Sequence, residues 1–338
     1  MNRKLMILSL LCILCLPAAE TFAMSSIEAP GQALTGYGSS ANYICSSYKE
    51  YRVGDWYDPW SGDWCWYYVP EKLKNGTSAP VAIILHGMML MSPDIYKDQI
   101  AHLCKQGYIV LFPQINKGGL AGLATDNDQN LMMHRAIDSV NTALDALGTK
   151  ADQDNLVLYG HSLGGLIAMC WAANEGTAIA PPVKSMVLVE PCIYSAIPAF
   201  VDVFVTITEL DFITKAQAAT CPVIMITGED DSIAPPSTAI EAYDALSNVS
   251  SKALYQVYSD RYGDEELIAD HMAPICDDGW MPSWAMDMLG GDGEVDTLDY
   301  RVFWTAMDAA FDSVVNIDFD MGAWSDGTPV LDVEKLRP

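Results

Sequence analysis

The sequence has few basic residues. Lys and Arg number 18 against 44 Asp and Glu, so the formal net charge at pH 7 is −26 over 338 residues. Such a surface repels phosphate backbones and anionic membranes, and no cluster of Lys or Arg offsets it. We therefore expect no nucleic-acid partner, and we interpret the charge as a feature that keeps the protein soluble outside the cell.

Long apolar runs are also scarce, and no segment after the N-terminus is apolar over the length that spans a bilayer. The N-terminal run LMILSLLCILCL, residues 5–16, follows two basic residues and precedes several alanines, which is the pattern of a secretory signal. We expect a signal peptide at 1–23, a flexible lead-in at 24–40, and a secreted or periplasmic protein without a stable membrane anchor.

The cysteines lack the paired short spacing of zinc ligands, so we expect neither a metal nor another cofactor. Two of the nine cysteines lie in the signal segment, and the seven that remain are an odd number, which leaves at least one thiol free. Cys45 and Cys65 flank the turn-rich stretch DWYDPWSGD, and this arrangement predicts a disulfide in an oxidising compartment. Cys192 and Cys276 are a second candidate pair.

Short, almost continuous apolar runs fill the middle of the chain, as is typical of strands buried on both faces of a parallel sheet. These runs are PVAIILHG, YIVLFPQ, NLVLYGHS, SMVLVEP, PVIMITGED and ALYQVYSD. Before them, residues 42–53 and 63–70 are rich in β-formers and are separated by turn residues, which predicts an antiparallel pair.

Segments with helical spacing alternate with these strands. The clearest covers residues 128–148, where one apolar stripe ends at a glycine. Alternation of strands and helices predicts an α/β domain with a mostly parallel central sheet, helices on both faces and the antiparallel strand pair at its N-terminal edge. Because no repeat or linker divides it, we expect one domain over 41–316, followed by a C-terminal tail at 317–338 without an assigned role.

One predicted strand in this series leads directly into a predicted helix through the motif Gly-x-Ser-x-Gly. The stretch is LVLYGHSLGGLIAM, residues 156–169. Gly160 and Gly164 make room for a sharp turn, and Ser162 is then exposed at its tip above the carboxyl ends of the strands. A serine hydroxyl is a poor nucleophile unless a base removes its proton. The sequence therefore predicts a nucleophilic serine with partners elsewhere in the chain.

The base can be found by elimination among five histidines. Only His271 lies in a loop after the last predicted strand of the parallel sheet, which makes it the candidate base. The orienting acid should follow a strand between Ser162 and His271. The spacing G-x-x-D-x-x-x-P favours Asp231, with Asp230 and Glu190 as alternatives.

Acyl transfer also needs N–H groups that bind the developing oxyanion. One donor is expected at Leu163, directly after the nucleophile. The other is expected at Met88, in the loop after the first parallel strand, where Gly87 permits a tight turn.

The order HG…GHSLGG…GEDDSIAP…DHMAP resembles the α/β-hydrolase superfamily, and in particular secreted bacterial lipases, esterases and cutinase-like enzymes. The resemblance implies Ser162, Asp231 and His271 as a catalytic triad and Met88 and Leu163 as oxyanion donors. We expect a carboxylic ester hydrolase that acts on small or polymeric esters; a peptidase of the same fold and a catalytically silent binding protein are the alternatives. Residues 193–220 form either a small cap over the acyl pocket or a helix of the core, and the oligomeric state stays open.

Overall fold

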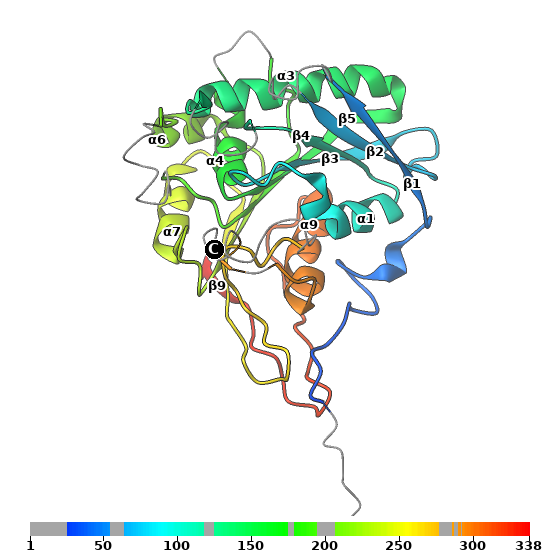
Figure 1. Ribbon diagram of the computed structural model, residues 1–338, viewed down its shortest axis with the longest axis vertical. Coiled ribbons are helices and arrows are strands. Elements are labelled where there is room, and N and C mark those ends of the chain that lie inside the picture. Colours follow the sequence, from blue (N-terminus) through cyan, green and yellow to red (C-terminus); the bar gives the residue numbers. More distant parts are fainter. Residues whose placement is uncertain are drawn as a thin grey trace, which may run out of the picture.

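The computed structural model describes residues 26–54, 64–117, 125–174, 179–194, 207–276, 286, 290–291 and 293–338. The expected signal peptide at 1–23 lies outside these residues. Within them the chain forms a nine-stranded sheet in the order β1-β2-β4-β3-β5-β6-β7-β8-β9, with helices on both faces (Figure 1).

The strands follow the predicted series closely. Their bounds are β1 (Tyr48–Val53), β2 (Cys65–Pro70), β3 (Ala79–Leu85), β4 (Ile109–Pro113), β5 (Ala151–His161), β6 (Ser185–Val189), β7 (Val223–Gly228), β8 (Lys252–Val257) and β9 (Glu334–Arg337). Strands β3 to β8 pair in parallel, whereas β1 pairs antiparallel with β2, and β2 with β4. The predicted parallel core and antiparallel N-terminal pair are both confirmed. Every residue of β4, β6 and β7 is buried, because helices cover these strands on both sides.

The helices form two layers. Helices α3 (Gln129–Leu147), α4 (Leu163–Cys170) and α7 (Pro236–Ala245) pack into one apolar cluster, and α1 (Lys97–Lys105) and α9 (Trp304–Phe311) pack into another on the opposite face of the sheet (Figure 1). In the described part of the chain, no helix combines the length and the hydropathy needed to cross a bilayer.

Helix α3 shows how local sequence sets these boundaries. The Asp128 side chain accepts hydrogen bonds from the N–H groups of Asn130 and Leu131 at 2.9 and 3.3 Å, which caps the first turn. The helix ends where Gly148 takes a φ of 55°, a conformation that glycine adopts without strain.

The expected boundary at residue 316 does not mark the edge of the packed structure. Residues 334–337 form β9, which pairs antiparallel with β8, and Trp324 is buried with its indole N–H 3.1 Å from a carboxylate oxygen of Asp260. The tail was not predicted as part of the sheet because β9 is short and polar, so it carries no apolar alternation. The lead-in also packs: Gly38 N–H donates to Asp308 at 2.7 Å in the core.

The predicted disulfide between Cys45 and Cys65 is wrong, because both thiols are free. In the antiparallel pair, Cys65 lies opposite Val53, at the far end of β1 from Cys45. The Cys45 thiol instead lies 3.3 Å from the carbonyl oxygen of Cys104. The two strands do pair, but Cys45 precedes β1, so the register places the two cysteines at opposite ends of the pair. The second candidate pair, Cys192 and Cys276, is also unbridged.

Candidate active site

Ser162 lies at a sharp turn between β5 and α4. Its backbone has φ 56° and ψ −119°, a region that non-glycine residues rarely adopt and that stores about 1–3 kcal/mol of strain. A Cβ on Gly160 would lie 2.4 Å from the Gly164 carbonyl oxygen, and a Cβ on Gly164 would lie 1.9 Å from the Leu85 carbonyl oxygen. Both glycines are therefore required for the close approach of strand, turn and helix.

The structure brings together the three residues that the sequence analysis singled out for a triad. His271 Nε2 lies 2.8 Å from Ser162 Oγ, and His271 Nδ1 lies 2.8 Å from Asp231 Oδ2. The three residues are 3 to 6% exposed. With the proton on Nδ1 donated to Asp231, Nε2 is left as the acceptor for the serine proton, which is the arrangement a general base needs.

Asp231 is held in place from its other side. Its Oδ1 accepts hydrogen bonds from the N–H groups of Ile233 and Ala234 at 2.8 and 2.7 Å, which leaves Oδ2 directed at the imidazole. Ile233 and Ala234 lie in the turn that leads into α7, so the Asp231 carboxylate also stabilises this turn. Asp231 is thus the acid that contacts His271.

Asp230, one of the two alternatives, points elsewhere. Its Oδ2 accepts hydrogen bonds from Ser259 Oγ and Arg261, both at 2.6 Å. These two bonds, with that from Ser259 the larger influence, lower the pKa of Asp230. Consecutive side chains leave the backbone in different directions, so the residue next to the acid has a separate partner.

Glu190, the other alternative, lies directly behind the imidazole without bonding to it. Its Oε2 is 3.9 Å from His271 Nδ1, which is beyond hydrogen-bond length. Glu190 is completely buried, and neither carboxyl oxygen has a hydrogen-bond partner among the described residues. Burial raises its pKa well above the ordinary value, and the nearby Asp231 and Asp270 raise it further. The shift disfavours the ionised form of Glu190 relative to an exposed glutamate.

The two expected oxyanion donors lie beside the serine. Leu163 is the first residue of α4, so its N–H has no partner within the helix. The loop after β3 packs against the nucleophile, since a Cβ on Gly87 would lie 3.2 Å from Ser162 Cβ. Met88 follows in this loop, and the next residue, Met89, has a φ of 67°, which marks a tight turn.

Comparison with known protein families agrees with this geometry. Residues 69–195 match a sequence profile of the chlorophyllase family, a stretch that carries β3 to β6 and the turn at Ser162 but ends before Asp231 and His271. That match, together with the sheet order and the serine turn, decides the superfamily. The chain has the α/β-hydrolase fold. No curated protein matches the sequence of this α/β-hydrolase.

Among the described residues of the α/β-hydrolase, one group of side chains has the spacing of metal ligands. It consists of His161, Glu190 and His271, whose ligand atoms lie within 4.8 Å of one another. The nitrogen atoms concerned already serve as donors, His161 Nε2 to the His271 carbonyl oxygen and His271 Nδ1 to Asp231. Both nitrogens that face Glu190 therefore carry hydrogens rather than free lone pairs in this arrangement, which does not fit metal ligands.

The segment at 193–220 was left open between a cap and a core helix. Its described part contains α6 (Phe212–Lys215), and Leu210 and Phe212 are buried in the same apolar cluster as α4. This part therefore packs with the core of the α/β-hydrolase. Phe200, Val203 and Phe204, which would line an acyl pocket if the segment were a cap, lie outside the described residues.

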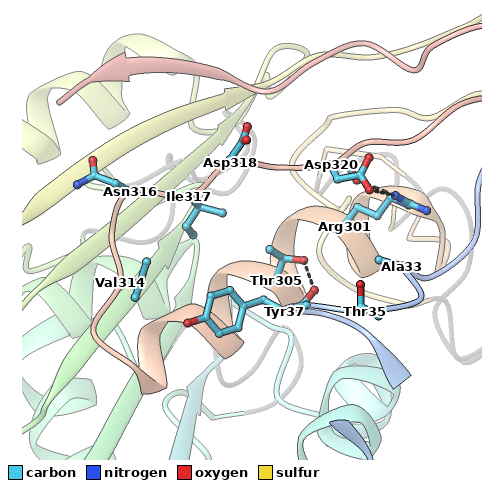
Figure 2. Close-up of a pocket in the computed structure, with 11 residues that line it drawn as sticks. Ala33, Thr35, Tyr37, Arg301, Thr305, Val314, Asn316, Ile317, Asp318 and Asp320 are labelled. Atoms are coloured by element: carbon cyan, nitrogen blue, oxygen red, sulfur yellow. Dashed lines mark hydrogen bonds and ion pairs between the residues drawn. The ribbon is translucent and has the colours of Figure 1, made fainter. Parts of the chain in front are cut away.

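A cavity of about 290 Å³ lies away from the serine, between the N-terminal segment, α9 and the chain that follows α9 (Figure 2). Tyr37, Thr305 and Arg301 line it, and Arg301 is held by Asp320 and by the carbonyl oxygen of Gly31. None of the three triad residues borders this cavity, so it is separate from the candidate active site.

Proposed function

We propose that this α/β-hydrolase cleaves carboxylic esters through an acyl-enzyme intermediate. The observation that carries the proposal is the continuous contact from Ser162 Oγ through the His271 imidazole to Asp231, with both separations at 2.8 Å. A nucleophile, a base and an orienting acid in this order are the constellation that activates a serine for attack on a carbonyl.

The proposed reaction begins when Ser162 Oγ attacks the ester carbonyl carbon while His271 Nε2 takes the hydroxyl proton. Asp231 stabilises the imidazolium, and the N–H groups of Met88 and Leu163 bind the oxyanion. When the intermediate collapses, the carbon–oxygen bond to the alcohol breaks and His271 gives its proton to the departing alcohol oxygen. Water then attacks the acyl-enzyme with His271 again as base, which releases the carboxylic acid and restores Ser162.

An ester is favoured over an amide by the family comparison. Chlorophyllases are carboxylic ester hydrolases, and their profile matches the part of this chain that carries the nucleophile. The match does not reach the base and the acid, so it supports the bond type and leaves the natural substrate as a separate question. Chlorophyll is accordingly one substrate to assay beside simple esters.

The first experiment is labelling with a fluorophosphonate, which phosphonylates an activated serine. The wild-type protein should be labelled at Ser162, and Ser162→Ala should be neither labelled nor active. A wild-type protein that stays unlabelled and hydrolyses no ester would overturn the proposal in favour of a binding protein on this fold.

The second experiment sets the substrate class. A series of p-nitrophenyl esters of increasing acyl length gives kcat/KM for each, and a matched ester and amide of one acid compare the two bond types. Faster turnover of the amide would show a peptidase and contradict the proposed ester hydrolase.

We further propose that the protein is exported, on the basis of the N-terminal segment. Expression with residues 1–23 present should then yield a mature N-terminus near residue 20 or 24 in the periplasm or medium. N-terminal sequencing that finds Met1 on exported protein would contradict this.

A further inference from the structure

A line of buried hydrogen bonds connects the loop after β3 with the backbone of His271. Gly87 N–H donates to the Tyr96 hydroxyl at 3.2 Å, and that hydroxyl lies 2.8 Å from His161 Nδ1. At the other side of its ring, His161 Nε2 lies 2.8 Å from the His271 carbonyl oxygen. Tyr96 and His161 are at most 1% exposed.

The direction of each bond in this line is determined by its ends. The N–H group of Gly87 can only donate, and the carbonyl oxygen of His271 can only accept. Because the carbonyl accepts, His161 Nε2 carries a hydrogen, and Nδ1 of the neutral ring is then the acceptor. The Tyr96 O–H donates to Nδ1, while the Tyr96 oxygen accepts from the Gly87 N–H.

This arrangement requires a neutral His161, since an imidazolium would present a second N–H to Tyr96. Burial lowers the pKa of His161 well below its ordinary value, and the nearby His271 lowers it further. The other titratable groups that face this ring are Tyr96, His86 and Glu190, whose Oε2 lies 3.6 Å from Nε2. Burial also raises the pKa of Glu190, which disfavours the ionised carboxylate that would stabilise a charged His161.

The two ends of the line belong to groups whose positions determine the rate of the proposed reaction. Gly87 immediately precedes Met88, a proposed oxyanion donor, and the His271 carbonyl belongs to the proposed base. A Cβ on Gly87 would lie 3.4 Å from His161 Nδ1, so the loop also packs directly against this ring. A shift of either end would change the distance between the oxyanion donor and the imidazole.

We propose that Tyr96 and His161 are positioning residues that tie the loop carrying Met88 N–H to the backbone of His271, so that the oxyanion donor and the base are set as one unit. This inference rests on the proposed function. It assigns His161, the residue before the nucleophile, a role beyond filling the turn.

The test compares Tyr96→Phe with Tyr159→Phe. Tyr159 is equally buried, in strand β5, and its hydroxyl makes no hydrogen bond to Gly87, Tyr96 or His161, so Tyr159→Phe removes a buried hydroxyl outside the line. For a p-nitrophenyl ester, Tyr96→Phe should lower kcat by about 10- to 100-fold, part of what loss of an oxyanion donor causes, with KM little changed. Tyr159→Phe should keep kcat close to that of the wild-type protein.

Binding of a transition-state analogue distinguishes a misplaced oxyanion donor from a general loss of folded structure. The inhibition constant of a trifluoromethyl ketone should rise in Tyr96→Phe by the same factor as kcat/KM falls, because the analogue uses the oxyanion donors. Equal losses of activity in the two Tyr→Phe variants, or none in Tyr96→Phe, would overturn the inference.

Variants of His161 test the other half of the line. His161→Gln keeps an N–H that can reach the His271 carbonyl, whereas His161→Leu removes it. His161→Gln should therefore retain more activity than His161→Leu, and combining Tyr96→Phe with His161→Leu should cost little more than the worse single change, as expected for residues that act together. Additive losses, or His161→Leu as active as His161→Gln, would contradict the proposed link.

One measurement does not depend on activity. Spectra of the protein with ¹⁵N-labelled histidine should show His161 neutral with its hydrogen on Nε2 between about pH 5 and 8, the range in which an ordinary histidine titrates. A charged His161, or one protonated on Nδ1, would overturn the inference even if the enzyme is active. Absence of ester hydrolysis in the wild-type protein, with this tautomer present, would instead count against the proposed function alone.

Discussion

Replacement of Asp231 by Asn should silence the enzyme through the tautomer of His271. Asp231 Oδ1 accepts two backbone N–H groups, so the oxygen of an asparagine would keep these bonds and its NH₂ group would face the imidazole. His271 Nδ1 would then have to accept, the ring hydrogen would move to Nε2, and Nε2 could no longer take the proton of Ser162. The corresponding change in the worked serine-protease example lowers kcat by about 10⁴, and we expect about 10³ to 10⁴ here.

That factor corresponds to about 4 to 5.5 kcal/mol in the activation free energy. The assay is the steady-state hydrolysis of a p-nitrophenyl ester, with circular dichroism to establish that each variant is folded. Asp231→Asn should leave KM nearly unchanged, because Asp231 contacts His271 and the backbone rather than the substrate.

Two neighbouring acids provide the controls. Asp230→Asn loses only bonds to Ser259 and Arg261, and Glu190→Gln changes a carboxyl that lies 3.9 Å from the imidazole, so each should lower kcat by less than about tenfold. If Asp231→Asn keeps near-normal turnover while Glu190→Gln abolishes it, Glu190 is the acid in solution and our reasoning from the 2.8 Å contact is refuted.

Other predictions concern the fold. Gly164→Ala should lower the free energy of unfolding by more than about 3 kcal/mol in a denaturant titration, because its methyl group would meet the Leu85 carbonyl oxygen at 1.9 Å; a stability like that of the wild-type protein would contradict this geometry. Burial raises the pKa of Asp296 to about 7, so the folded state holds a proton that the unfolded state releases, and the free energy of unfolding should fall as pH rises from about 4 to about 7. Asp296→Asn should reduce that fall by up to about 4 kcal/mol, and an unchanged pH dependence would count against the buried acid. Alkylation before reduction, followed by peptide mass spectrometry, should find Cys45 and Cys65 as free thiols; a peptide pair linked through them would refute the strand register.

The sequence predicted those parts of the molecule that depend on local pattern. The strands of the parallel core are continuous apolar runs, and the turn at Ser162 is specified by two glycines within five residues, so each could be located without knowledge of the rest. His271 could be found as the one histidine in a loop after the parallel strands. These features require no information about which distant residues meet.

Features that depend on register or side-chain direction could not be predicted in this way. The pairing of Val53 with Cys65 is set over the whole length of β1 and β2, and a sequence does not show how far each strand extends. The spacing to the following proline favoured Asp231 over Asp230, but only the structure shows that the turn directs the Asp231 carboxylate at His271. The buried, unpaired carboxyl of Glu190 gave no sequence signal, because glutamate is usually exposed.

The packed lead-in has a consequence for how the chain acquires its structure. Backbone N–H groups of Ile27, Glu28 and Gly38 bond to side chains that are 237, 297 and 270 residues further along. Contacts of such separation form slowly, and these need the residues up to Ser325 to be present. The N-terminal segment thus reaches its final place only after residues 264–325 have been synthesised, which keeps the newly made chain incompletely folded until then.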